Sequence, residues 1–278
     1  MVETPVLEIA QWQGSGTPTA RRLRRGAADL AALVPAGDHI RVDVSDRPGT
    51  ATDGVAALDV LSRNLQAVRA AIPDRPAVVL GGDCGVELAP VEAALARHGT
   101  GLAVIWFDAH GDLNTPESSP SGAFHGMVLR TLLGDGPSEL LPAHTLCPEQ
   151  LVLAGVRALD PGERAFVDAG AVERIGVADL VDPSPLLSAV EATGAEAVYV
   201  HIDVDVLDPE FFASVGTPEP HGITPARLVG AVRALAARFP LAGLGITEYE
   251  PARPSDQDVV REIVRALVPQ VRSTPPGR

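Results

Sequence analysis

Short apolar segments alternate with longer amphipathic segments from one end of the chain to the other. Most of the apolar segments are near-continuous runs of Val, Ile, Leu and Ala, as in strands that are covered on both faces. Strands that alternate with helices predict a mostly parallel sheet with helices on both sides, which is the α/β class. We expect about eight strands, at residues 6–10, 40–44, 77–80, 102–107, 151–154, 172–175, 197–202 and 241–246.

The amphipathic segments have the length of helices. We expect helices at residues 19–33, 55–71, 85–97, 161–169, 224–238 and 255–271. The chain has 278 residues, and α/β sheets often reach this length as a single domain. Neither a repeat nor a linker-like change in composition interrupts it, so we expect one domain over residues 1–278, with a frayed tail at 273–278.

The charged residues exclude several classes of function. All 22 Lys and Arg residues are arginine. A chain without lysine cannot form the Schiff bases of pyridoxal-phosphate enzymes, and it lacks the lysine with which a P-loop contacts phosphate. The net charge of −14 at pH 7 repels nucleic acid and suits a cationic partner.

The cellular location is indicated by the absence of membrane-spanning and secretory segments from the sequence. No uninterrupted apolar stretch approaches 18 residues, so we expect no helix that spans a membrane. Residues 1–5 resemble no secretory signal, and two cysteines, Cys84 and Cys147, are too few for a secreted disulfide framework. We therefore expect a cytoplasmic protein that binds neither membranes nor nucleic acid.

Polar side chains follow four of the expected strands at their carboxyl ends, which is where open α/β sheets bind ligands. The segments are Gly-Gly-Asp-Cys-Gly at 81–85, Asp-Ala-His-Gly-Asp at 108–112, Asp-Val-Asp-Val-Leu-Asp-Pro at 203–209 and Thr-Glu-Tyr-Glu-Pro at 247–251.

Two of these segments have the spacing of metal ligands. Asp108, His110 and Asp112 are two residues apart, and Asp203 and Asp205 repeat that spacing after another strand. Aspartates that face one another repel strongly unless a cation neutralises them. Carboxylates with an imidazole suit Mn²⁺ better than a structural zinc site, and this number of oxygen ligands suits two bridged ions. The alternative is a set of turn and helix-cap aspartates, which are common after strands.

The motifs at 81–85, 108–112 and 203–209, in that order, resemble those of the ureohydrolase, or arginase, superfamily. The resemblance extends from about residue 78 to residue 251. It implies a hydrolase with two manganese ions that cleaves guanidino or amidino C–N bonds, on an eight-stranded parallel α/β/α sandwich with three layers. It also implies a homotrimer or homohexamer.

The resemblance further implies which residues bind the two metals. Asp108 and Asp203 would bridge them, His110 and Asp205 would complete the shell of one, and Cys84 with Asp112 would complete that of the other.

Three residues are implied in catalysis. His125 matches the family's acid/base or proton-shuttle histidine, and Asp112 would take part in proton transfer. Glu248 matches the carboxylate that binds the guanidinium group, and Glu250 is the nearby alternative. Apart from the motif, His125 reads as a buried histidine near the start of a helix.

Two positions depart from the family pattern. Cys84 stands where the family has a histidine ligand, and a thiolate is softer and more negative than an imidazole. If Cys84 is a ligand, it alters the reactivity of the metal, favours another divalent metal such as zinc, or causes the loss of one metal. Alternatively, Cys84 binds no metal and is a buried cysteine that acts as a small apolar residue. His201 stands where arginases commonly have a small residue, and it either orients a ligand or packs within the strand.

The substrate is indicated by two further segments. By resemblance, Asn114, Ser119 and Ser121 would bind an α-carboxylate, and Asp160 and Glu163 would meet an α-ammonium group. Residues 160–163 also read as a helix start, with an N-cap, a proline at N1 and a glutamate at N3. One carboxylate contact is missing, because alanine occupies position 123 where arginases commonly have asparagine.

These observations favour a metal-dependent hydrolase of L-arginine or of a derivative such as N-hydroxy-L-arginine, with urea or hydroxyurea and L-ornithine as products. The alternatives within the superfamily are agmatinase, formimidoylglutamate hydrolase and guanidino-acid hydrolase. Two others are a metal-poor pseudo-enzyme that binds a guanidino ligand and an amide hydrolase similar to histone deacetylases.

Overall fold

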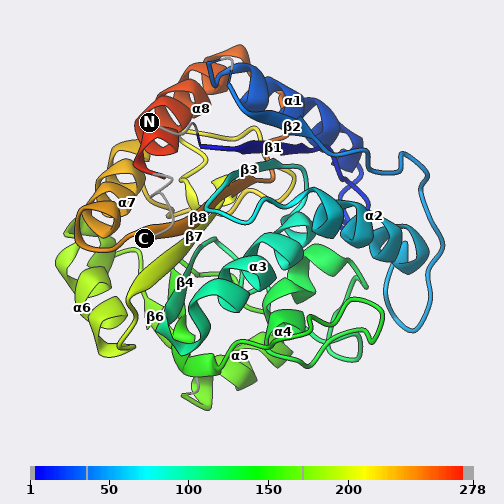
Figure 1. Cartoon of the computed structure of the whole chain (residues 1–278), viewed down its shortest axis with the longest axis horizontal. Helices are drawn as coiled ribbons and strands as arrows, with labels where there is room; N and C mark the ends of the chain where they lie inside the picture. Colours follow the sequence, from blue (N-terminus) through cyan, green and yellow to red (C-terminus); the bar gives the residue numbers. More distant parts are fainter. Residues whose placement is uncertain (1–3, 36, 171, 272–278) are drawn as a thin grey trace.

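A computed structural model describes residues 4–35, 37–170 and 172–271, and in these residues eight strands form one sheet (Figure 1). Every strand pairing is parallel, and the order across the sheet is β2-β1-β3-β8-β7-β4-β5-β6. The strands are β1 (Val6–Ile9), β2 (His39–Arg41), β3 (Val78–Gly81), β4 (Leu102–Phe107), β5 (Leu151–Ala154), β6 (Glu173–Ile175), β7 (Ala197–Asp203) and β8 (Leu241–Thr247). The expected α/β fold is confirmed, and the sheet is wholly rather than mostly parallel.

The strand order determines where a ligand can bind. The chain passes from β3 to β4 across the positions of β7 and β8, which it fills later. The four central strands, β3, β8, β7 and β4, are therefore neighbours although they are distant in sequence. Since the sheet is parallel, their carboxyl ends lie at one edge, at the point where the strand order reverses.

Helices cover both faces of the sheet, and each face has its own apolar core (Figure 1). One face packs against α1 (Leu23–Ala32), α6 (Ser184–Ala192), α7 (Pro225–Arg238) and α8 (Pro254–Leu267). The other packs against α2 (Leu58–Ala71), α3 (Leu88–His98), α4 (Val128–Leu132) and α5 (Pro161–Asp168). Helices α4 and α6 were not predicted from the sequence.

Element bounds differ from the expected ones by a few residues for local reasons. The helix expected at 85–97 begins with a 3-10 turn, Cys84–Glu87, because the Asp83 side chain accepts the N–H of Gly85 and caps it. The expected tail at 273–278 lies outside the described residues. Among the residues that the structure describes, no helix is both long enough and apolar enough to cross a membrane.

Candidate active site

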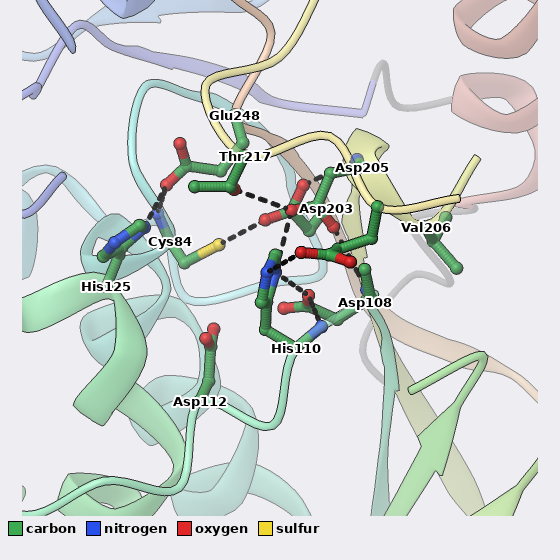
Figure 2. Close-up of polar contacts among 12 residues, drawn as sticks. Cys84, Asp108, His110, Asp112, His125, Asp203, Asp205, Val206, Thr217 and Glu248 are labelled. Atoms are coloured by element: carbon green, nitrogen blue, oxygen red, sulfur yellow. Dashed lines mark hydrogen bonds and ion pairs between the residues drawn. The ribbon is translucent and has the colours of Figure 1, made fainter. Parts of the chain in front are cut away.

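The side chains expected to bind metal or the guanidinium group lie at the carboxyl ends of the four central strands (Figure 2). Cys84 follows β3, Asp108 follows β4, Asp203 is the last residue of β7 and Glu248 follows β8. Each of these four side chains is buried. The parallel topology therefore brings together residues that are up to 164 positions apart, the separation of Cys84 and Glu248.

The first cluster contains Asp108, His110 and Asp205. Nδ1 of His110 lies 3.0 Å from Oδ2 of Asp205 and 3.5 Å from Oδ1 of Asp108. Asp108 also accepts the backbone N–H of His110, which fixes the turn after β4. One ligand atom of each residue lies within 4.8 Å of the others, so the three can hold one metal ion.

The second cluster contains Cys84, Asp203 and Glu248, whose ligand atoms meet the same 4.8 Å limit. Sγ of Cys84 lies 3.4 Å from Oδ2 of Asp203 and 3.3 Å from the Thr247 hydroxyl. The backbone N–H of Cys84 donates to Glu248 at 3.1 Å. The thiol therefore faces the carboxylates, as a metal ligand would, within a closely packed site.

Asp112 lies near both clusters but belongs to neither of them (Figure 2). Its Oδ2 accepts the indole N–H of Trp106 at 3.3 Å, and the same N–H donates to Asp108 at 3.1 Å. Asp112 and Glu248 both have positive φ, at 52° and 60°. Such strain in residues other than glycine is typical of functional sites, where the surrounding structure holds a side chain in one direction.

Burial and mutual repulsion dominate the electrostatics of the site. Burial, and then the charge of Asp205, raises the pKa of Asp108. Burial with neighbouring carboxylates raises the pKa of Asp112 and of Asp203 well above the ordinary range. Burial also acts to raise the pKa of Asp205, but His110 outweighs it and lowers that pKa to about 2. The cluster thus holds more negative charge than its one imidazole neutralises.

His125 pairs with Glu248 of the second cluster, with Nδ1 3.3 Å from Oε1 (Figure 2). Burial lowers the pKa of His125, but the hydrogen bond and charge of Glu248 more than offset this, and the net pKa is raised. Glu250, the alternative to Glu248, instead accepts the Thr17 hydroxyl at 3.0 Å. Of the two glutamates, Glu248 is the one that lies with the clustered residues.

A cavity of about 520 Å³ opens onto the clusters. Its lining contains every residue expected to bind the amino-acid end of a substrate: Asn114, Ser119, Ser121, Asp160 and Glu163. It also contains His110, Asp112, His125 and Asp203, so the expected metal, proton-transfer and substrate residues share one space.

Hydrogen bonds hold two of the substrate-end residues in place. The Asn114 amide donates to Asp160 at 2.9 Å and accepts the Ser118 hydroxyl at 2.9 Å. Glu163 accepts the backbone N–H of Asp160 at 2.8 Å and that of Leu113 at 3.0 Å. Glu163 thus stabilises the start of α5, as the helix-start interpretation predicts, while it lines the cavity.

Sequence reasoning missed three polar residues in contact with these clusters. The Trp106 indole was expected only as part of a strand, although it donates to two of the carboxylates. The Thr217 hydroxyl donates to Asp205 at 3.1 Å, and Glu219 lies 3.9 Å from Nε2 of His110. Thr217 and Glu219 lie outside the four strand-end segments, so only the folded chain brings them to the site.

The donor set fits divalent metal ions. Carboxylate oxygens predominate, with one imidazole nitrogen and one sulfur. Burial, and then mutual repulsion, raises the pKa of three of the carboxyl groups, and a bound cation would offset both effects. The two three-residue clusters share no member, so each can hold a separate ion.

A parallel α/β sheet with clustered carboxylates, an imidazole and a thiol above its central strands is the arrangement of a metal-dependent hydrolase. A family model described as "Arginase family" matches residues 15–269. An arginase of Staphylococcus aureus (strain MRSA252) is 31% identical over 270 residues, which cover 85% of this chain and 88% of that protein. The chain therefore belongs to the arginase family and is a ureohydrolase, which acts on C–N bonds.

Solved structures show the same fold. Arginase of Entamoeba histolytica in complex with L-ornithine matches with a TM-score of 0.84 at 22% identity, over 96% of this chain and 99% of that one. Proclavaminate amidino hydrolase of Streptomyces clavuligerus matches with a TM-score of 0.71 at 20% identity, over 97% and 91%. At these identities the likeness concerns the fold alone.

Proposed function

We propose that the chain hydrolyses the guanidino C–N bond of L-arginine or of a derivative such as N-hydroxy-L-arginine, and releases urea or hydroxyurea with L-ornithine. The cavity carries this proposal, because it joins the two clusters to polar groups suited to an amino-acid end. Its acidic lining suits a cationic guanidinium group. The arginases among the relatives make an arginine-like substrate the first choice.

In this proposal the metals are two manganese ions, or another divalent metal because of Cys84, and when bound they would supply a hydroxide nucleophile near neutral pH. Glu248 binds the guanidinium group and holds its carbon in line for attack. Asp112 accepts a proton from the attacking group, and Trp106 keeps its carboxylate in place. His125 delivers a proton to the leaving amine; its raised pKa increases the protonated fraction near neutral pH.

Cys84 is the reason to include the hydroxylated substrate. Burial, followed by the charge of Asp203, raises the pKa of its thiol well above the ordinary value, so the thiol must lose a tightly held proton to bind a metal. A weakly held metal raises the barrier for arginine, which is a poor electrophile. N-hydroxy-L-arginine releases the same ornithine amine, but its hydroxylated guanidine is less basic, and it can react at such a centre.

A product-resolved assay tests the proposal. The manganese-loaded chain is given L-arginine and N-hydroxy-L-arginine in parallel, and ornithine is quantified. We expect ornithine from the hydroxylated substrate at a rate at least about 10-fold higher, a difference of about 1.4 kcal/mol in barrier. Equal turnover, or a preference for arginine, contradicts the proposed effect of Cys84.

The same assay separates the other members of the superfamily. Agmatine, formimidoylglutamate and guanidino acids are offered alongside, and turnover of one of these alone would replace the proposed substrate. Fewer than one metal per chain, with no turnover of any guanidine, would favour a pseudo-enzyme that binds its ligand without hydrolysis.

Asp160→Asn is expected to raise KM for the amino-acid substrate about 10-fold or more, because a charged hydrogen bond to the α-ammonium is lost. It should leave kcat little changed, since Asp160 lies at the substrate end of the cavity, where it accepts the Asn114 amide. The matched comparison is 5-guanidinopentanoate, which has the carboxylate but no amine, and its KM should not change. An equal rise for both substrates would show that the variant only disturbs the loop.

Thr217→Val is expected to weaken metal binding about 10-fold, because it removes the hydroxyl that donates to Asp205 while it preserves the volume of the side chain. The measurement is a manganese titration of the chelated protein. Thr17→Val serves as the control, since Thr17 donates to Glu250, outside the clusters. Equal manganese affinities in the two variants would show that Thr217 does not support metal binding.

A further inference from the structure

His201 lies directly beneath the candidate metal site. It is fully buried on β7, and its ring stacks on Trp106 of β4 with the centroids 3.5 Å apart. It lies two positions before Asp203, so both side chains leave the strand on the same face. Its Nε2 lies 3.6 Å from Sγ of Cys84, and one ligand atom each of Cys84, Asp108 and His201 lie within 4.8 Å of one another.

A buried carboxylate lies behind the ring. Nδ1 of His201 is 3.7 Å from Oε2 of Glu87, which is fully buried and accepts the Tyr199 hydroxyl at 2.7 Å. Among the described residues, Nδ1 of His201 and Oε1 of Glu87 have no hydrogen-bond partner. Buried polar groups without partners are costly, and a native structure that keeps them calls for an explanation.

The sheet leaves space for this arrangement. Gly245 of β8 is the register neighbour of His201, and a Cβ there would lie 2.2 Å from Oε1 of Glu87. Gly243 is the neighbour of Tyr199, and a Cβ there would lie 2.4 Å from the tyrosine ring. Two glycines in one central strand thus make room for a line of polar side chains, Tyr199–Glu87–His201, that ends at Cys84.

We propose that His201 is a metal ligand, and that its Nε2 joins Cys84 of the second cluster and Asp108 of the first around one ion. This rests on the proposed function, which places metal at the site. Two ligands on a tetrahedral metal, with bonds of about 2.3 Å to sulfur and about 2.0 Å to nitrogen, lie about 3.5 Å apart. The observed 3.6 Å between Sγ and Nε2 agrees with that spacing. Glu87 then supplies the outer carboxylate that metal-binding histidines commonly contact.

The proposal accounts for both departures from the family pattern together. By resemblance, an imidazole is expected at position 84 and a small residue at position 201, and in this chain cysteine and histidine occupy these positions. The imidazole is supplied by strand β7 instead of the loop after β3. A purely packing role explains the stack on Trp106, but it explains neither the buried Glu87 nor the free Nδ1. The resulting sulfur, nitrogen and oxygen donors favour zinc or cobalt over manganese at this ion.

Cobalt substitution tests the proposal in the full chain. The chelated protein is loaded with two equivalents of Co²⁺, and hyperfine-shifted N–H protons of metal-bound imidazoles are counted by ¹H NMR. Wild type should give two such signals, from His110 and His201. His201→Phe, which preserves the stack on Trp106, should give one and should bind the first cobalt at least about 10-fold more weakly. His98→Phe, at the end of α3, is the control and should retain both signals.

A second variant places the imidazole in the loop after β3, at position 84, instead of on β7. Cys84→His with His201→Ser should restore two signals and the affinity for the first cobalt, while the thiolate-to-cobalt absorption of wild type disappears. One imidazole signal in a wild-type protein that binds two cobalt ions would overturn the proposal and leave the proposed function intact. A wild-type protein that binds no metal would overturn both.

Discussion

Cys84→His is expected to raise manganese affinity about 10- to 100-fold and to raise turnover of L-arginine relative to N-hydroxy-L-arginine. The thiol lies against the Thr247 hydroxyl and Asp203, and burial, together with the charges of Asp203 and the neighbouring carboxylates, holds its proton. Manganese must displace that proton to bind, and it then gains a soft ligand that it accommodates poorly. A neutral imidazole binds without this cost and adds no further negative charge.

Comparison of Cys84→His with the wild type requires that the site accommodates the larger histidine side chain. Sγ of Cys84 already contacts His201 and Thr247, so overpacking will cost some stability, on the order of 1–3 kcal/mol. Thermal melting of the chelated variant measures that cost separately from metal affinity. Cys147→His is the matched control, because Cys147 is an exposed cysteine away from the site. If arginine turnover stays unchanged while manganese affinity rises, Cys84 does not determine the choice of substrate.

The sequence was sufficient to predict the sheet and the strand ends that carry the site. Buried parallel strands are near-continuous apolar runs, and the polar residues that follow them stand out because little else in those segments is polar. For this reason Asp108, Asp203 and Glu248 could be assigned to one edge before their spatial order was known. The order of the strands is a property of the crossovers between them, and local periodicity does not encode it.

The side chains beneath the site could not be predicted in the same way. Glu87 appears in sequence as one more residue near the start of a helix, and Tyr199 as part of an apolar strand. Their contact depends on the pairing of β7 with β8 and on two glycines that leave space. Single-residue patterns carry no such information, because it arises from three segments that meet only in the folded chain.

Removal of the metals is expected to lower the melting temperature by roughly 10 °C at pH 8, and by much less at pH 5. Saturation of a site at about 1,000 times its Kd adds about 4 kcal/mol to stability, and 1 kcal/mol shifts the melting temperature of a chain of this size by about 2–4 °C. The measurement is thermal melting with excess manganese and with chelator at pH 5, 6.5 and 8.

The sign of the pH effect follows from the site carboxyl groups. The folded pKa values of Asp108, Asp112 and Asp203 are raised above that of an unfolded aspartate, about 3.9, so their contribution to stability is lost as the pH rises through the folded values. Asp83, raised to about 6 by burial and then by the charge of Glu248, acts in the same direction within the measured window. The pKa of Asp205, about 2, is depressed, and that group adds no change between pH 5 and 8.

The chelated protein should therefore lose stability steadily from pH 5 to pH 8, whereas the manganese-loaded protein should not, because the metals neutralise the carboxylates and compete better with protons as the pH rises. Asp203→Asn should flatten the slope of the chelated protein by removing one repelling charge. Asp179→Asn, an exposed aspartate outside the site, should leave the slope unchanged. A chelated protein whose stability is constant or rises with pH would mean that neither burial nor mutual repulsion disfavours these ionised carboxylates in the absence of metal, and the electrostatic argument for a two-metal site would fail.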